Sequence, residues 1–228
     1  MSKTKLAVFD FDGTLIPEQS GHQLSIELLH TKQVSKWTAT KLILWGIRYK
    51  AHLPYKESTA RELIFKAFQN ENADEVDKYI DKFYEENLEE TVREPLLKIA
   101  EELRQDGMEL IILSGAFTAT LESFAKRHDF MHIVGTEMEV DENGNYTGKV
   151  DGECVAGDEK IKRLYNYADE HFGKDNWEIE YALADHYTDR DFLDLANKVY
   201  AVDPDATLKR YARKNGWETI EFETHKEK

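Results

Sequence analysis

Carboxylates, hydroxyls and a lysine stand at or near the ends of apolar runs in this sequence. The apolar, β-prone run 6–9 ends in Asp10 and Asp12, which are followed by Gly13 and Thr14. Two carboxylates one residue apart repel each other unless a cation lies between them. A site that offers only oxygen ligands favours Mg²⁺. This stretch therefore predicts a magnesium-dependent reaction centre.

Similar polar residues follow later apolar runs. Ser114 follows the run 110–113, and Asp185 and Asp189 follow a short apolar strand, whereas Lys160 lies early in a predicted helix. Because the carboxyl ends of parallel strands meet at one edge of a sheet, we expect these side chains to share one cleft although they are far apart in the sequence.

The first stretch has two other interpretations. An EF-hand loop needs Gly at position 6 and Glu at position 12. Counted from Asp10, these positions hold Leu15 and Gly21, so the chain does not fit an EF-hand. The second alternative is a strand end with turn-forming acids and no chemistry, and the later polar stretches argue against it.

The residues around Asp10 resemble the first motif, Asp-x-Asp-x-Thr, of the haloacid dehalogenase-like (HAD) phosphohydrolases. The resemblance implies that Asp10 attacks phosphorus and forms an aspartyl-phosphate. It implies that Asp12 protonates the leaving oxygen and then activates water, and that its backbone carbonyl binds Mg²⁺. Thr14 would orient Asp12 and the loop.

Three later segments resemble the other motifs of this superfamily in the same order. Ser114 and Gly115 match the motif that holds a phosphoryl oxygen. Lys160, in a Gly-x-x-Lys segment after a predicted hairpin, matches the lysine that neutralises the nucleophile and the phosphoryl group. Asp185 and Asp189 match the Asp-x-x-x-Asp motif, with Asp189 binding the metal through water or steadying Lys160. The metal ligands that the resemblance implies are Asp10, Asp12, Asp185 and Asp189.

The elements expected to position these residues form an α/β fold. Between the first strand and residue 106, apolar residues recur at helical spacing with no strand, which predicts a helical cap at 17–91 inserted into a core of 1–16 and 92–228. The rest alternates between strands and helices, so we expect a Rossmann-like parallel sheet sandwiched by helices. The predicted helices are 21–31, 35–51, 55–69, 73–88, 94–105, 117–127, 157–172 and 190–197; the predicted strands are 108–113, 181–184, 198–202 and 217–222, with a hairpin at 137–140 and 146–150. Asp203 is predicted to cap the last helix, with Pro204 at its first position.

Composition limits the class of the protein and its partners. The chain has 228 residues, 41% of them hydrophobic, which suits one large domain with a modest insertion. Its formal net charge of −15 argues against nucleic acid as a partner. Residues 1–5 lead into the first strand without a signal-peptide pattern, and no apolar run approaches the roughly 20 residues of a membrane span. We expect a cytoplasmic protein without stable membrane association, and no disulfide because Cys154 is the single cysteine.

The substrate is predicted less closely than the reaction. The helical insertion and the Gly-x-x-Lys form resemble the phosphoserine phosphatase-like branch (subfamily IB), which implies Mg²⁺-dependent hydrolysis of a small phosphorylated metabolite. Members hold the substrate's amino group with a Glu nine residues after the nucleophile, where this chain has Gln19, and the substrate carboxylate with a cap arginine, for which Arg61 is roughly placed. We predict both as substrate-binding residues.

Three alternatives remain open at the level of sequence. The same scaffold would serve a phosphotransferase that passes the phosphoryl group to an alcohol, or a non-catalytic binding domain. The apolar run 42–47, flanked by Lys41, Arg48 and Lys50, fits a buried cap core or a contact with a lipid or choline-type phosphate. The oligomeric state is not predicted.

Overall fold

A six-stranded parallel sheet forms the centre of the computed structural model, which describes residues 3–31, 40–41, 43–44 and 57–222. The strand order is β3-β2-β1-β6-β7-β8, so the first strand lies in the interior of the sheet. The strands are β1 Thr4–Phe9, β2 Glu109–Phe117, β3 His132–Thr136, β6 Trp177–Ala184, β7 Lys198–Val202 and β8 Glu218–Ile220. The chain therefore has the parallel α/β sheet that the sequence predicts.

Helices cover both faces of this sheet because alternate residues of its strands point in opposite directions. Ala7 and Phe9 of β1 belong to one buried cluster, together with apolar residues of α5 and α6. Leu6 and Val8 belong to the other, together with residues of α7, α8 and α9. These helices are α5 Glu94–Gln105, α6 Thr118–His128, α7 Asp158–Phe172, α8 Arg190–Leu193 and α9 Ala206–Asn215.

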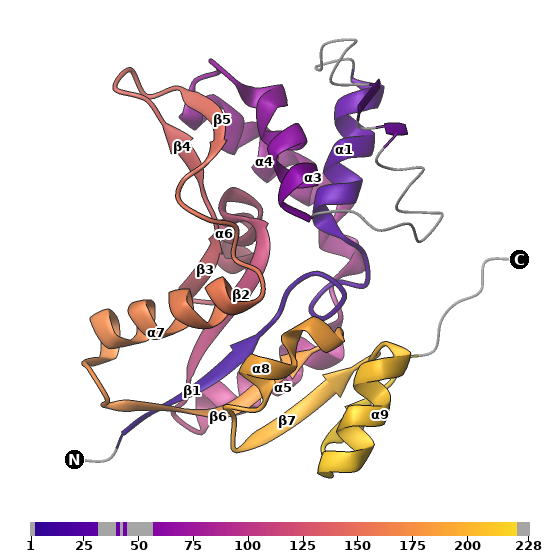
Figure 1. Cartoon of the computed structure of the whole chain (residues 1–228), viewed down its shortest axis with the longest axis vertical. Coiled ribbons are helices and arrows are strands. Elements are labelled where there is room, and N and C mark those ends of the chain that lie inside the picture. The colour runs from indigo at the N-terminus through magenta and orange to yellow at the C-terminus, as the bar shows by residue number, and fades with distance from the viewer. Residues whose placement is uncertain (1–2, 32–39, 42, 45–56, 223–228) are drawn as a thin grey trace, which may run out of the picture.

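A helical segment lies between β1 and β2 and stands beyond one end of the sheet (Figure 1). It contains α1 Ser20–His30, α3 Glu57–Phe65, η1 Lys66–Phe68, α4 Ala73–Asn87 and η2 Glu89–Thr91. Apolar residues bury one face of its longest helix, α4, where Val76, Ile80 and Phe83 are buried. Within the described residues no helix has the length and apolar character needed to cross a bilayer.

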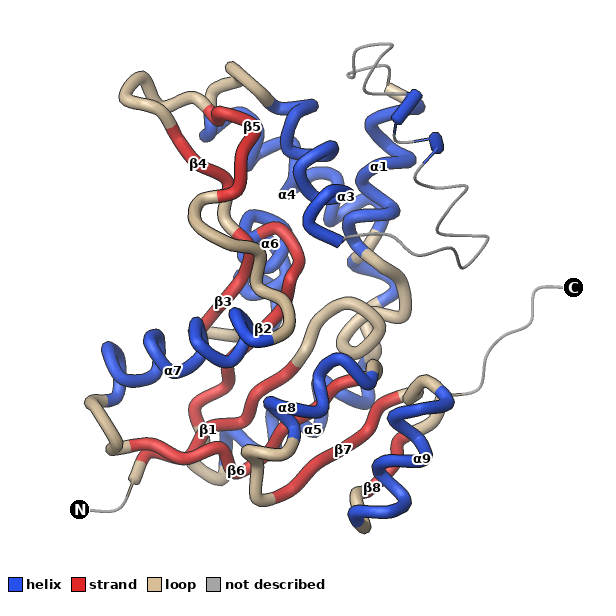
Figure 2. Tube along the Cα trace, in the orientation of Figure 1, coloured by secondary structure: helices blue, strands red, loops and turns tan. Residues whose placement is uncertain are grey.

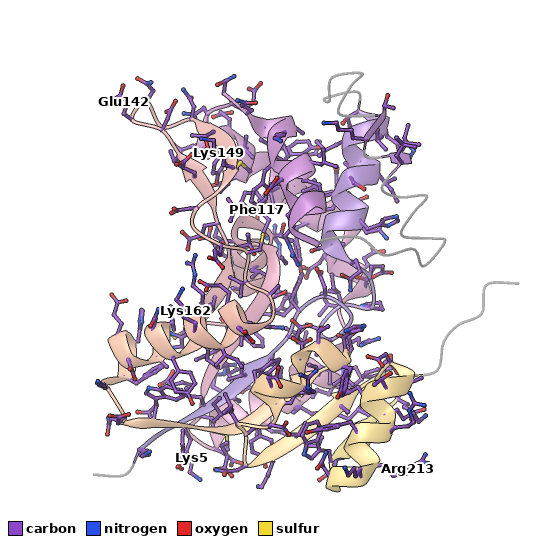
Figure 3. The ribbon with its side chains drawn as sticks, viewed as in Figure 1. Lys5, Phe117, Glu142, Lys149, Lys162 and Arg213 are labelled. Carbon is purple, nitrogen blue, oxygen red and sulfur yellow. The ribbon has the colours of Figure 1, made fainter. Side chains whose placement is uncertain are left out.

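The hairpin of β4 Met138–Val140 and β5 Tyr146–Val150 forms a separate two-stranded sheet that reaches the helical segment (Figure 2). The Asn70 backbone N–H donates to the Tyr146 carbonyl over 2.8 Å, and the Tyr146 N–H donates to the Glu71 carbonyl over 2.9 Å. Phe117 is labelled in Figure 3 where the sheet meets these elements. The centre of its ring lies 5.0 Å from that of Phe65 and 5.9 Å from that of Tyr146. The hairpin thus joins the helical segment to the end of β2.

The predicted elements differ from the observed ones in a few places. β3, a five-residue strand, is not predicted from the sequence, and α8 ends at Leu193, four residues before the end of the predicted helix 190–197. Asp203 is not the cap of α9: the Asp205 carboxylate accepts from the Thr207 N–H at 2.6 Å and the Leu208 N–H at 3.1 Å. The predicted helix 35–51 and most of the apolar run 42–47 lie outside the described residues.

Candidate active site

Asp10 follows β1 directly and is buried at the carboxyl end of the sheet, 5% exposed. Its Oδ1 lies 2.8 Å from the Nζ of Lys160, which reaches it from the first turn of α7. The same ammonium lies 2.6 Å from Oδ1 of Asp189. Residues 150 positions apart therefore form one buried ion-pair network, as the sheet-edge argument predicts.

Asp185, at the end of β6, completes a group of three carboxylates. One oxygen each of Asp10, Asp185 and Asp189 lies within 4.8 Å of the others. Gly13 makes this approach possible, because a Cβ at that position would lie 2.2 Å from Oδ2 of Asp185. Oxygen ligands on a close-packed acidic edge are the donor set that Mg²⁺ takes in proteins. These residues fit a divalent cation.

The charges of this network do not balance. Burial raises the pKa of Asp10 to about 7, with repulsion from Asp189 adding to it against the attraction of Lys160. Burial, with the charges of Asp10 and Asp189, raises the pKa of Asp185 to about 8. Burial alone would lower the pKa of Lys160, but the two carboxylates beside it raise that pKa above its usual value. The Lys160 ammonium thus pairs with Asp10 and Asp189, two of the three neighbouring carboxylates, and a divalent cation would supply further positive charge.

Asp12 is held apart from this group by the start of α1. The Ser20 N–H donates to Oδ1 of Asp12 over 2.8 Å, and burial raises the pKa of the Asp12 carboxyl. Thr14 lies in the same loop, but its Oγ1 is buried without a hydrogen-bond partner within the described residues. The hydrogen bond that holds the Asp12 carboxylate comes from the Ser20 N–H, and the role of Thr14 in orienting this loop stays a prediction.

Ser114 and Gly115 lie near the end of β2, where the register of β2 with β3 shifts between Leu113 and Phe117. The Ser114 hydroxyl accepts from the Ala116 N–H over 3.2 Å. Arg61 of α3 reaches this point, because a Cβ on Gly115 would lie 2.2 Å from its guanidinium. The structure thus brings Arg61 to the motif residues. Gln19 is exposed at the N-cap of α1, and its side chain does not cap that helix.

Two further residues at this edge are missed by the sequence analysis. Thr136, the last residue of β3, donates from its buried hydroxyl to the Gly115 carbonyl over 3.0 Å and accepts from the Val155 N–H over 3.1 Å. Arg93 donates to the carbonyls of Gly13 and Thr14. A threonine that ends an unpredicted strand and an arginine before Glu94-Pro95 carry no signal in a single sequence.

A family model described as haloacid dehalogenase-like hydrolase matches residues 7–194, a span that includes every residue of the buried network. The chain belongs to this family. Among the relatives of the chain, a histidinol-phosphatase of Neisseria meningitidis serogroup C (strain 8013) is 25% identical over 243 residues, covering 95% of this chain and 98% of the relative. A probable phosphoserine phosphatase of Schizosaccharomyces pombe (strain 972) is 29% identical over 164 residues, which is 72% of this chain and 50% of that protein.

Solved structures give the same fold. A protein of unknown function from Bordetella pertussis Tohama I has a TM-score of 0.84 at 19% identity, over 96% of this chain and 99% of that chain. A phosphoserine phosphatase with a phospho-aspartyl intermediate analogue has a TM-score of 0.61 at 17% identity, over 96% and 94%. Within the family, the chain is phosphoserine phosphatase-like in its sequence and structural neighbours.

Proposed function

We propose that this hydrolase is a Mg²⁺-dependent phosphatase that hydrolyses a small phosphate monoester through an aspartyl-phosphate. The observation that carries the proposal is the buried contact of Asp10 with Lys160, 2.8 Å apart, beside two further carboxylates. A nucleophilic carboxylate paired with a fixed ammonium suits attack on an anionic phosphoryl group. The phosphatase names of the relatives support the enzyme class, a phosphoric monoester hydrolase.

In the first step, an Asp10 carboxylate oxygen forms a bond to phosphorus, and the bond from phosphorus to the leaving oxygen breaks. Asp12 donates its proton to that leaving oxygen, a role that suits a carboxyl whose pKa burial has raised. Lys160 and Ser114 hold the phosphoryl oxygens during the transfer. The products of this step are the alcohol and the phosphorylated Asp10.

In the second step, Asp12 takes a proton from water, whose oxygen attacks phosphorus and releases inorganic phosphate and free Asp10. The ligands for Mg²⁺ in this proposal are Asp10, Asp185 and Asp189 with the Asp12 backbone carbonyl. When bound, the ion offsets the repulsion between Asp10 and the phosphate. Asp189 also keeps Lys160 in place, since its carboxylate lies 2.6 Å from Nζ.

The helical segment is proposed as the cap, residues 17–91 over a core of 1–16 and 92–228. Its position beyond the end of the sheet (Figure 1) and the reach of Arg61 to Gly115 support this assignment. We propose Arg61 for an anionic group of the substrate and Gln19 for a polar group. Closure of such a cap would exclude bulk water from the cleft.

The substrate class proposed is a phosphate ester of a 2-amino alcohol. Histidinol phosphate and phosphoserine, the substrates in the names of the two relatives, share this unit and differ in the group beyond it. Arg61 favours a carboxylate at that end, whereas the coverage of 98% of the histidinol-phosphatase favours histidinol phosphate. Both substrates therefore belong in the test.

The test is turnover of para-nitrophenyl phosphate, with Mg²⁺ and with EDTA, followed by phosphoserine, histidinol phosphate and glycerol 1-phosphate, which lacks the amino group. We expect Mg²⁺-dependent release of phosphate and a kcat/KM for phosphoserine or histidinol phosphate at least about tenfold above that for glycerol 1-phosphate, equivalent to about 1.4 kcal/mol. Added alcohols that accept phosphate in place of water would indicate phosphotransfer. No turnover of any ester by the folded, Mg²⁺-loaded protein would overturn the proposal.

A further inference from the structure

Arg93 makes several contacts that cannot be predicted from its position in the sequence. Its Nη1 donates to the Gly13 carbonyl over 2.6 Å and to the Thr14 carbonyl over 2.9 Å. Its Nη2 lies 2.5 Å from Oδ2 of Asp203, and its guanidinium lies 4.7 Å from the ring centre of Phe222. The side chain is 11% exposed, so these partners replace water almost completely.

The two carbonyls belong to the loop that carries the proposed nucleophile and the proposed acid. Gly13 has φ +81°, and its Cα approaches Asp185 so closely that a Cβ would lie 2.2 Å from Oδ2. A small rotation of the peptide after Gly13 would therefore change the space between Asp10 and Asp185. The Arg93 guanidinium bonds the carbonyl of that peptide and so fixes its orientation.

Arg93 also lies where the helical segment rejoins the sheet. Its own N–H donates to the Leu15 carbonyl over 3.0 Å, so the chain leaves and re-enters the core at neighbouring points. Asp203 supplies the third anchor, because its other oxygen accepts from the Phe222 N–H over 2.7 Å. One guanidinium thus joins the loop after β1, the return of the helical segment and the chain ends of β7 and β8.

We propose that Arg93 is a positioning residue: through the Gly13 and Thr14 carbonyls it sets the placement of Asp10 and Asp12, and Asp203 sets the placement of Arg93. The inference rests on the proposed phosphatase function. Arg93 touches no reacting atom in this arrangement, so it acts through the loop. An arginine suits this task because its rigid planar fork fixes the directions of its donors and stacks on the Phe222 ring, whereas a lysine ammonium is a point charge on a flexible stem.

The test compares kcat and KM for para-nitrophenyl phosphate in Arg93→Met, Arg93→Lys and Asp203→Asn. Misplacement of reacting groups lowers turnover, so we expect kcat to fall about 100-fold in Arg93→Met and about tenfold in Arg93→Lys. KM should change less than about threefold, because Lys160 and Ser114 hold the phosphate from other elements. Asp203→Asn keeps the backbone at φ +38°, which Asn tolerates, and removes the charge together with one of the two acceptor oxygens that Arg93 and Phe222 use.

Arg127→Met is the matched control. Arg127 also bonds a carboxylate and a backbone carbonyl, Asp81 Oδ1 at 2.7 Å and the Ser123 carbonyl at 2.8 Å, but it joins α4 to α6 away from the acidic edge. We expect its kcat to stay within about twofold of wild type even where its melting temperature falls as far as that of Arg93→Met.

Amide hydrogen exchange distinguishes a local change in the loop after β1 from a loss of stability throughout the protein. In Arg93→Met we expect faster exchange of the amides of residues 13–16, with β2 unchanged, and in Arg127→Met no change at 13–16. A folded Arg93→Met with kcat within threefold of wild type overturns the inference and leaves the phosphatase proposal intact. If Arg93→Met does not fold, Arg93→Lys and Asp203→Asn both at wild-type kcat overturn it. A wild-type protein without turnover overturns the phosphatase proposal first.

Discussion

The acidic edge of the sheet and the α4 surface of the helical segment use charge in opposite ways. At the sheet edge, Lys160 pairs with the buried Asp10 and Asp189, and Asp185 adds a third carboxylate beside them. On α4, Lys78 and Glu75 form an ion pair on the surface, and the side chain of each is 71% exposed. Lys82 and Glu86 form a second exposed pair one turn later. Exposed pairs of this kind add about 0–1 kcal/mol to stability, whereas buried unbalanced charge lowers it.

This difference indicates that the acidic edge lowers the stability of the folded chain, which we relate to the proposed reaction. Nothing in the packing of the sheet requires Asp10, Asp185 and Asp189 to be charged, and apolar residues fill both faces around them. Their repulsion is useful only when a cation and a phosphoryl group enter. The α4 surface keeps the helix solvated and carries no such strain.

The largest expected effect comes from Asp10→Asn. The amide is not a nucleophile, so phosphatase activity should fall by about 10⁴-fold or more. Because one charge leaves a buried, repulsive group, the free energy of unfolding without metal should stay the same or rise by up to about 2 kcal/mol. Urea unfolding and initial rates check both, and Asp74→Asn on exposed α4 is the control with neither effect. Loss of stability in Asp10→Asn would contradict the strain argument.

Lys160→Met should affect stability as well as turnover. It leaves the carboxylates of Asp10 and Asp189 without their ammonium, which costs about 3–5 kcal/mol for a buried pair broken on one side. Lys78→Met on α4 should cost less than about 0.5 kcal/mol. Equal losses in the two variants, measured by urea unfolding at pH 8 in EDTA, would mean that the two regions do not differ as proposed.

A pH series sharpens the comparison. The pKa of Asp10 rises to about 7 and that of Asp185 to about 8 on folding, so the folded chain binds more protons than the unfolded chain between about pH 4 and pH 8. In EDTA, stability should therefore fall as pH rises through that window and level off above it. Mg²⁺ should flatten this slope and raise the melting temperature most at pH 8. A melting temperature in EDTA that rises from pH 5 to pH 8 would contradict the shifts.

The smallest effect is expected at the hairpin. Tyr146→Phe removes the hydrogen bond from the Tyr146 hydroxyl to Oδ1 of Asp77, 2.7 Å long, which ties β5 to α4. The loss should be about 0.5–1.5 kcal/mol in unfolding free energy with kcat unchanged, because the contact lies far from the acidic edge. Thermal unfolding and para-nitrophenyl phosphate assays measure the two quantities. A tenfold fall in kcat would show that the hairpin contact governs the site.

The sheet edge was the more predictable of the two regions. Asp10, Asp185 and Asp189 follow buried strands, and the topology of a parallel sheet brings such ends together whatever lies between them. Lys160 is predicted as a site residue from its Gly-x-x-Lys motif, early in a predicted helix. The helix Glu94–Gln105 is predicted at its observed bounds, with Gly107 as the signal for its end.

The contacts between elements could not be predicted. The packing of the hairpin on η1 and α4 depends on tertiary partners that leave no periodic signal in the sequence. Asp203 and Asp205 both precede a helix in acceptable cap positions, and only the backbone geometry distinguishes the cap from the partner of Arg93. β3 has five residues, and its apolar run is too brief to predict a strand. The helix before it ends at Asp129, whose backbone is left-handed.

The adjacency of Leu15 and Arg93 has a consequence for how this protein could diversify. The Arg93 N–H donates to the Leu15 carbonyl, so the backbones that enter and leave the helical segment are one hydrogen bond apart. The entropy of closing such a segment grows only slowly with its length. A segment of different length or sequence can therefore be inserted between Leu15 and Arg93 without changing the order of the strands. Substrate preference can then change while Asp10, Asp185 and Asp189 keep their positions.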